Sequence, residues 1–418
     1  MLGQRIKELR KESKLTQQHL SEGIITRSYL SQIEKGLVQP SFDVLEKLSE
    51  KLDCTVDDFF KTVENKDLLL SQVKKEIKTA ENQVNSNLFD KVETFVQKNE
   101  YLSREDLNEY DKGILMWIHG KYYEYKKDYN HAIMFFEKSF YQLEKGNHTN
   151  VMLRSLDSLG HSHSQVQDNE KALHILNKAY RIMIYDQISG MLRISILVNM
   201  GIVHGKLREF YSAINFLEEA RDLNDRLGTY YKAGEIFMAL GVCNMELKRY
   251  KEAKYSYERA LKYFKLCEDK YHEAGTYTNL GILFSYQKDY YQADLDLRTA
   301  INIYKHVKAD EAKIMNAQVE LAKLYYLQAE YEKASSLCDD IIKVGNNNKH
   351  KAQALELLGD INYRLSSVEV ALDNYSEAKK VLVSHSMLCD HVCKKIADIY
   401  FKLGEYEKAA DSYQECFS

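Results

Sequence analysis

The chain has very little proline and no long apolar stretch. Its 418 residues include one proline, Pro40, and 18 glycines. Proline and glycine form most of the tight turns of all-β proteins, so their scarcity argues against such a fold. The apolar runs are only a few residues long, and the N-terminal MLGQRIKELRKESK lacks the apolar core of a signal peptide. We therefore expect an almost entirely helical, cytoplasmic protein with no membrane partner.

The chain also lacks a strong net charge and any paired-cysteine motif. Its formal net charge of −4 provides no chain-wide attraction to nucleic acid, so any DNA contact must come from a local patch. The seven cysteines are scattered and form no CxxC pair, which favours free thiols in a reducing compartment. Cys389 and Cys393 lie four apart on an expected helix. A metal pair is conceivable there, but core packing is the favoured interpretation, so we expect no metal and no cofactor.

Motifs of the common enzyme classes are absent as well. The sequence contains no glycine-rich phosphate loop, no HExxH and no nucleophile elbow. His161 and His163 are two residues apart, so on a helix they point to different sides and make a poor metal pair. We therefore expect no catalytic residue, and an enzyme is the least supported class of function.

What the chain does have is a pair of small residues that recurs eight times. A Gly or Ala is followed twelve positions later by an Ala, and each pair starts about forty residues after the last. Two antiparallel helices pack closely only where neither carries bulk, while a large residue such as Phe136 or Tyr257 fills the adjoining groove. The pairs are Gly120/Ala132, Gly160/Ala172, Gly201/Ala213, Gly241/Ala253, Gly281/Ala293, Ala322/Ala334, Gly359/Ala371 and Ala397/Ala409.

These units resemble tetratricopeptide repeats, each a helix, a turn and a second helix. That family repeats about every 34 residues, so the longer period here requires longer helices or turns. A single unit cannot bury its apolar face alone, so we expect an all-α superhelix of about eight repeats over 103–418.

Residues 1–60 follow a different pattern, that of five short amphipathic helices. The expected helices are 4–12, a second one capped by Thr16, a third from Arg27 to Gly36 capped by Thr26, a fourth opened by Pro40 and Ser41, and a fifth capped by Thr55. The segment LTQQHLSEGIITRSYLSQIEKGLVQPS closely resembles the helix-turn-helix of lambda-repressor-like domains. The stretch between the two threonine caps is one residue shorter than in the common form of that family.

The resemblance implies that the third helix of this head lies in the major groove of DNA. Leu30 and Ile33 are directed inward, which leaves an outward set that would read base edges. Arg27 suits guanine and Gln32 suits adenine. The outward residues are Arg27, Ser28, Ser31, Gln32 and Lys35, and the candidates for phosphate contacts are Gln17, Tyr29 and Lys35.

The distribution of charge in the head agrees with this placement. Residues 1–35 carry seven Lys/Arg against four Asp/Glu, whereas residues 43–58 carry two against six. The excess positive charge thus lies in the part that holds the recognition helix. The alternative is an ordinary helical cap with a solvated charged face.

Residues 61–102 form the expected linker between the head and the repeats. The segment 62–85 has no glycine or proline, which predicts a helix and not a loose tether. Residues 88–97 form a second amphipathic segment. Ser103 and Asp106 then have the spacing of a capping box and predict the start of the next helix.

In arrays of the family that the repeats resemble, the first helix of each unit lines a concave groove. With the small residue as position eight, positions two, five, six, nine and twelve face that groove. An asparagine amide there can both donate to and accept from a peptide backbone, and Arg154 or Lys323 can bind a carboxylate. The peptide candidates are Arg154, Asp157, Asn199, Glu235, Asn279, Asn316 and Lys323, with His161, Thr278 and Glu320 also at groove positions. The alternative is polar residues on a hydrated groove.

The combination of this head with this array resembles the RRNPP family, most closely its NprR-type and PlcR-type members. The resemblance implies a homodimeric transcriptional regulator that binds a pseudo-palindromic DNA operator and is controlled by a short signalling peptide in the groove. It also implies a second reading, a Rap-like protein that binds or dephosphorylates a response regulator. We expect the homodimer, or a higher oligomer, to form through the aromatic C-terminal repeats, which carry Tyr363, Tyr375, Tyr400, Phe401 and Tyr413.

Overall fold

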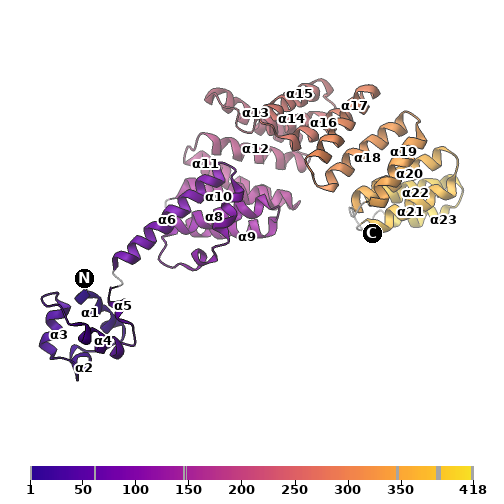
Figure 1. Cartoon of the computed structure of the whole chain (residues 1–418). Helices are drawn as coiled ribbons and strands as arrows, with labels where there is room; N and C mark the ends of the chain where they lie inside the picture. The colour runs from indigo at the N-terminus through magenta and orange to yellow at the C-terminus, as the bar shows by residue number, and fades with distance from the viewer. Residues whose placement is uncertain are drawn as a thin grey trace. The chain divides into compact units, whose positions relative to one another are not determined.

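The computed structural model describes residues 2–60, 63–144, 146, 148–344, 348–382 and 387–415. Within these ranges every regular element is a helix, α1–α23 and the short 3-10 helix η1, which confirms the predicted all-α class (Figure 1). The chain forms two compact units, Met1–Asp168 and Asn169–Ser418.

The head contains the five predicted helices around one apolar core. They are α1 (Leu2–Glu12), α2 (Gln17–Ser21), α3 (Arg27–Glu34), α4 (Phe42–Lys51) and α5 (Val56–Phe60). The side-chain oxygens of Thr16 and Thr26 accept from the backbone N–H groups of His19 and Tyr29, both at 3.2 Å, so two predicted caps are confirmed. The core consists of Ile6, Leu20, Leu30, Ile33, Leu45, Leu48, Leu52 and Phe59.

Close packing of α1 against α3 depends on a glycine. A Cβ added to Gly3 would lie 1.7 Å from the carbonyl oxygen of Ile33. No side chain fits at that distance, so Gly3 allows the two backbones to approach. The sequence pattern did not single it out.

The predicted linker helix is present and is packed along one side. It is α6 (Val63–Asn85), and Thr62 of the predicted segment lies outside the described residues. Val73, Ile77, Ala80 and Val84 are buried at helical spacing, and α6 contacts both α7 (Phe89–Val96) and α8 (Glu109–Tyr125). Much of α6 is therefore docked on the start of the array, and the boundaries at 60 and 102 stay predictions.

The predicted capping box at Ser103 is wrong. Ser103 ends η1 (Asn99–Ser103), and α8 begins six residues later, where the side chain of Asn108 accepts from the N–H of Asp111 at 2.8 Å. The carboxylate of Asp106 instead pairs with Arg104 at 2.6 Å. Asn108 is an equally good cap, and buried Leu107 fixes the chain just before it.

The repeats form eight helix pairs, and each predicted small-residue pair places one member on each helix. All the small residues of these pairs are buried. The helices after α8 are α9 (Tyr129–Leu143), α10 (Thr149–Gln165), α11 (Asn169–Tyr185), α12 (Met191–Lys206), α13 (Phe210–Leu227), α14 (Ala233–Glu246), α15 (Tyr250–Leu266), α16 (Lys270–Tyr286), α17 (Tyr290–His306), α18 (Glu311–Leu327), α19 (Tyr331–Val344), α20 (Asn348–Arg364), α21 (Val368–Val381), α22 (Met387–Lys402) and α23 (Tyr406–Glu415).

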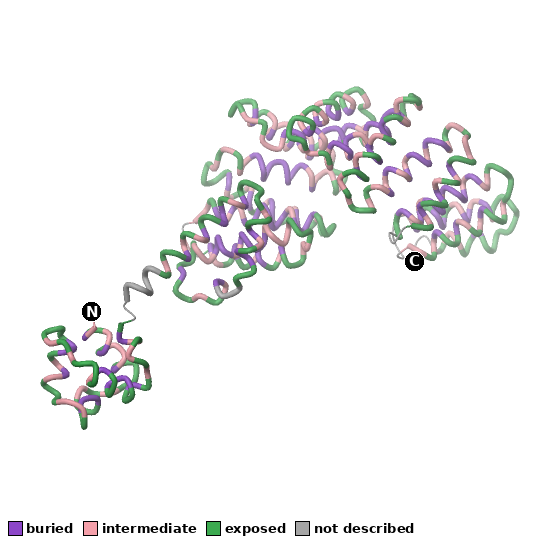
Figure 2. The backbone as a smooth tube through the Cα atoms, in the orientation of Figure 1, coloured by how far each residue is buried: buried purple, intermediate pink, exposed green. Residues whose placement is uncertain are grey.

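Within a pair, the large residue of the second helix covers the small residue of the first. A Cβ on Gly241 would lie 2.4 Å from the ring of Tyr257, and one on Gly201 would lie 2.6 Å from Leu217. The prediction that a large side chain of one helix fills the space beside the small residue of the other is confirmed. As a result, buried residues follow the sides where neighbouring helices meet, and exposed residues gather at the turns (Figure 2).

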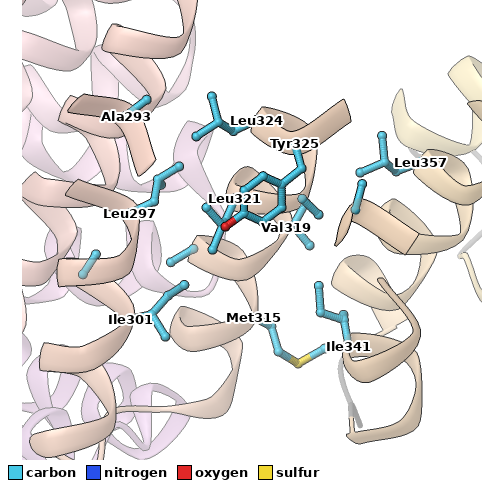
Figure 3. Close-up of a cluster of buried hydrophobic side chains, with 14 of the residues drawn as sticks. Ala293, Leu297, Ile301, Met315, Val319, Leu321, Leu324, Tyr325, Ile341 and Leu357 are labelled. Atoms are coloured by element: carbon cyan, nitrogen blue, oxygen red, sulfur yellow. The ribbon is translucent and has the colours of Figure 1, made fainter. Parts of the chain in front are cut away.

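The core continues from one repeat to the next. Leu297 and Ile301 of α17, Met315 of α18 and Ile341 of α19 belong to one buried cluster (Figure 3). In this part of the second unit, helices therefore pack against the following repeat as well as against their own partners, as expected for a repeat array.

The turn inside every repeat has the same left-handed residue. It lies seven residues after the small residue, with φ between +59° and +79°. Only one of the eight is glycine, although glycine is the residue that adopts this conformation without a steric cost. The positions are Lys127, Gln167, Arg208, Lys248, Lys288, Ala329, Ser366 and Gly404.

Candidate DNA-binding helix and groove cavity

α3 presents the predicted DNA-reading residues on its outer side. Leu30 and Ile33 are buried in the head, as predicted. Arg27, Ser28, Gln32 and Lys35 are exposed, and Tyr29 and Ser31 are half-buried. The geometry permits the predicted base and phosphate contacts, which stay a prediction.

A buried ion pair holds α3 in place. The Arg10 guanidinium donates to both Glu34 carboxylate oxygens, at 2.6 and 3.0 Å, and also to the Leu15 carbonyl at 2.8 Å. Gln17 Nε2 donates to Glu34 at 2.8 Å. Burial alone would raise the pKa of Glu34, but the bonds from Arg10 and Gln17 outweigh it and lower that pKa. One amide hydrogen of Gln17 is thus committed inside the head, which leaves the other for its predicted phosphate contact.

A cavity of about 760 Å³ lies along the first helices of the last four repeats, α16, α18, α20 and α22. Many lining residues occupy the groove positions expected from the small-residue phase. Ile282, Lys323 and Asp360 are all at position nine of their units, and Lys395 is at position six. The cavity therefore lies where the repeat pattern predicts the groove, along the first helices of the units.

One wall of the cavity is a network of opposite charges between α20 and α22. Lys395 Nζ lies 2.6 Å from Glu356 and 2.8 Å from each oxygen of Asp360. Burial alone would lower the pKa of Lys395, but the two carboxylates outweigh it and raise that pKa. His391 Nδ1 also lies 2.8 Å from Glu356. On another wall, Lys323 lies 2.8 Å from Glu320 of its own helix and forms no other ion pair within the described residues. That wall can offer a cation to a ligand.

Of the predicted peptide residues, only Lys323 lines this cavity, together with Glu320. Asn279 of α16, Asn316 of α18 and Glu235 of the earlier helix α14 are half-buried and do not line the cavity. Glu235 lies 3.6 Å from Lys232. Asn199 is 4% exposed, so it packs inside the array and its replacement would also affect folding. Thr278 is likewise buried and donates to the Ala274 carbonyl of its own helix at 3.1 Å.

Arg154, in the other unit, is engaged inside the protein. Its Nη1 lies 2.6 Å from Glu81 of α6, its Nη2 donates to Asn85 at 3.1 Å, and its guanidinium lies 3.9 Å from the ring centroid of Trp117. Asp157 is 8% exposed, and His161 Nε2 lies 3.5 Å from Glu124. A carboxylate ligand at Arg154 would have to compete with Glu81.

Five residues of this cavity lie on the last two repeats and were not among the predicted peptide residues. Gln353, Glu356, Asp360, His391 and Lys395 all occupy groove positions under the rule applied to the earlier units. The same rule would have found them.

The aromatic end of the array differs in part from the prediction. The expected contact of Tyr375 with a partner chain is wrong, because Tyr375 is 2% exposed, covers Gly359 and donates to Asp360 at 2.6 Å. Phe401 is 58% exposed and can contact a partner.

Within the described residues there is no candidate for a membrane span or for a metal site. No helix there has the length and apolar character needed to cross a bilayer. No group of three or more His, Cys, Asp and Glu side chains in these ranges could hold a metal ion, and Cys389 and Cys393 are buried in α22.

Family models match both parts of the chain. A helix-turn-helix model matches residues 6–59, and a tetratricopeptide-repeat model matches residues 229–265 and 391–418. The HTH-type transcriptional regulator SinR of Bacillus subtilis is 47% identical over 58 residues, which are 13% of this chain and 52% of SinR. The chain therefore spans about half the length of this relative.

Solved structures resemble most of the chain in fold. The apo quorum sensor NprR from B. thuringiensis superposes with a TM-score of 0.63 at 16% identity, over 85% of this chain and 99% of NprR. NprR in complex with its cognate peptide NprX gives 0.55 at 16% identity, over 81% and 98%. Apo RapI gives 0.60 at 14% identity, over 83% and 96%. The chain thus joins a helix-turn-helix domain to a tetratricopeptide array and has the fold of NprR and RapI, the combination that its resemblance to the RRNPP family predicted.

Proposed function

We propose that this protein is a DNA-binding transcriptional regulator controlled by a short peptide bound in the groove of its repeats. The observation that carries the proposal is the presence, in one chain, of a helix-turn-helix head and of a large cavity on the first helices of the array. The head provides an output on DNA, and the cavity provides an input for a ligand.

The head supports the DNA-binding half of the proposal. The exposed side of α3 carries Arg27, Gln32 and Lys35, which suit guanine, adenine and phosphate. The bidentate Arg10–Glu34 pair fixes that side relative to the rest of the head. A DNA-reading helix must be held rigidly, because discrimination depends on the position of each donor.

The cavity supports the peptide half. Its volume of about 760 Å³ is in the range of sites that enclose small ligands. It combines Lys323, the Glu356 and Asp360 carboxylates, and the rings of Tyr286 and Tyr326. A peptide has both charges and apolar side chains, so it can use all of these groups. The likeness in fold to NprR, solved with its peptide NprX, agrees with this assignment.

A binding-site selection from random duplex DNA tests the first half. The parent protein should select a pseudo-palindromic sequence, because one head reads few base pairs and two are needed for affinity. Arg27→Ala should lose preference at one base position per half-site while the remaining positions are still selected. Lys47→Ala, an exposed residue of α4 paired with Asp43, is the matched control. If the parent protein enriches no particular sequence from the random DNA, sequence-specific DNA reading by the head is refuted.

Calorimetry with short peptides selected from a displayed random library tests the second half. Lys323→Met should weaken the best peptide by about tenfold, and Asn279→Ala should weaken it if the amide holds the peptide backbone. Lys343→Met, an exposed residue on the second helix α19, should change nothing. Full affinity in Lys323→Met would place the ligand elsewhere.

We propose further that the protein acts in the cytoplasm as a homodimer. Phe401 and Tyr406, 58% and 65% exposed, provide apolar surface at the C-terminal repeats. The likeness in fold to RapI supports the alternative, a protein that binds or dephosphorylates a response regulator, alone or as a second activity. Loss of phosphate from a response-regulator domain on addition of this protein would establish that activity.

A further inference from the structure

A second cavity, of about 250 Å³, lies between α13, α14 and α15. It shares no lining residue with the groove cavity. Its walls carry the cations Arg221 and Arg259 and the carboxylate of Asp225, together with the amide of Asn224 and the rings of Tyr230, Phe237 and Tyr263.

Arg259 has no carboxylate partner among the described residues. Its guanidinium lies 5.2 Å from the ring centroid of Phe237 and 5.4 Å from that of Tyr263, and its Nη2 donates to the Tyr263 hydroxyl at 3.0 Å. Its Nε is buried and makes no hydrogen bond within the described ranges. Two aromatic rings thus hold the guanidinium in place, and its Nη1, which forms no hydrogen bond within the described ranges, is left to donate to an anion.

Asp225 and Asn224 offer the opposite chemistry in the same cavity. In the part of the chain that the structure describes, Asp225 forms no ion pair, so it does not reach Arg259 across the cavity. Asn224 is 4% exposed; its Nδ2 donates to the Tyr231 carbonyl at 2.8 Å, and its Oδ1 is buried without a described donor. A buried acceptor usually has a hydrogen-bond donor, and a bound group that enters the cavity can supply one here.

We propose that this cavity binds a free α-amino acid as its zwitterion. The ligand carboxylate accepts from Arg259, and the ligand ammonium donates to Asn224 Oδ1 and to the Asp225 carboxylate. The side chain then packs on Ile236 and Phe237, which favours an apolar amino acid. A simple anion would leave the buried Asn224 Oδ1 without a donor, and an apolar ligand would leave both that acceptor and Arg259 without a partner.

The site would give the protein a second input, separate from the peptide. It does not depend on the proposed peptide site, because no residue is shared. A regulator built this way responds to the supply of an amino acid as well as to a signalling molecule.

Calorimetry on the full-length protein tests the proposal with each standard L-amino acid at about 1–10 mM. At least one apolar amino acid should bind with one-to-one stoichiometry. Its N-acetyl and carboxamide derivatives should bind at least about tenfold more weakly, because each lacks one charge of the zwitterion. The same loss is expected for Arg259→Gln and for Asp225→Asn.

A control variant, and a variant that should fold in any case, allow the binding result to be interpreted. Lys262→Gln is the matched control, because Lys262 is an exposed cation of α15 that does not line the cavity. It should stay within about threefold of the parent protein. Asp225 is exposed, so Asp225→Asn should fold even if Arg259→Gln does not. The proposal is overturned if no amino acid binds, if the N-acetyl derivative binds as tightly, or if Asp225→Asn retains full affinity.

Discussion

Replacing Glu81 by glutamine should weaken the docking of the linker helix α6 on the array. Glu81 is 4% exposed and accepts from Arg154 at 2.6 Å and from Lys78 at 2.8 Å. Glutamine has the same shape, but it carries no negative charge, and its amide N–H donors would face the cations Arg154 and Lys78. The change therefore isolates the electrostatic part of the docking.

The expected loss of docking free energy depends on the interactions that Arg154 and Lys78 retain in the Glu81→Gln variant. Breaking a buried pair by removing one member usually costs about 3–5 kcal/mol. Arg154 retains its bond to Asn85 and its position over Trp117, and the side chain of Lys78 is 65% exposed, so neither cation is stranded. We therefore expect a smaller loss, about 2–3 kcal/mol.

Amide hydrogen exchange measures this loss directly. The inward amides of α6, between Val73 and Val84, should exchange about 30- to 150-fold faster in Glu81→Gln. Trp117 is the only tryptophan of the chain, so its emission reports the position of Arg154 independently. A shift in emission should accompany the faster exchange.

The same contact predicts how docking depends on pH. Burial alone would raise the pKa of Glu81, but the bonds from Lys78 and Arg154 lower it below its ordinary 4.5. Since the folded pKa is the lower one, the stabilisation is complete above the unfolded value and is lost as pH falls through the folded value. Protection of α6 in the parent protein should fall in that acid range, and Glu81→Gln should remove this dependence.

Lys75→Gln is the matched control on the same helix, because Lys75 is exposed. It should change protection by less than about 0.5 kcal/mol. Equal exchange of α6 in Glu81→Gln and in the parent protein, with unchanged Trp117 emission, would refute the reasoning.

Three other outcomes follow from the packing of the head and the array. Gly241→Ala should destabilise the array by about 1–3 kcal/mol in calorimetric melting, because the added Cβ would lie 2.4 Å from buried Tyr257. Lys248→Gly should instead stabilise it by about 0.5–1 kcal/mol, since φ is +59° there, and a lowered melting temperature would contradict this. Glu34→Gln should remove the acid-induced loss of head stability that the lowered pKa of Glu34 predicts, as followed by circular dichroism while the pH falls from about 5 to about 2.

The sequence by itself determined the architecture. The spacing of Gly241 and Ala253, repeated in every unit, predicted the helix pairs and their phase, because close helix packing requires small residues at regular intervals. The caps Thr16 and Thr26 predicted two helix starts of the head for an equally local reason, since a cap bonds an amide three residues away.

Only the tertiary structure decided which groove residues line the cavity. Every repeat has the same groove positions, so the local pattern cannot distinguish Lys323, which lines the cavity, from Arg154, which is held by Glu81. Glu81 and Arg154 are separated by 73 residues, and no periodicity connects them. Likewise Arg259 and Asp225 come from different helices, and only the folded chain shows that neither has an ion-pair partner among the described residues.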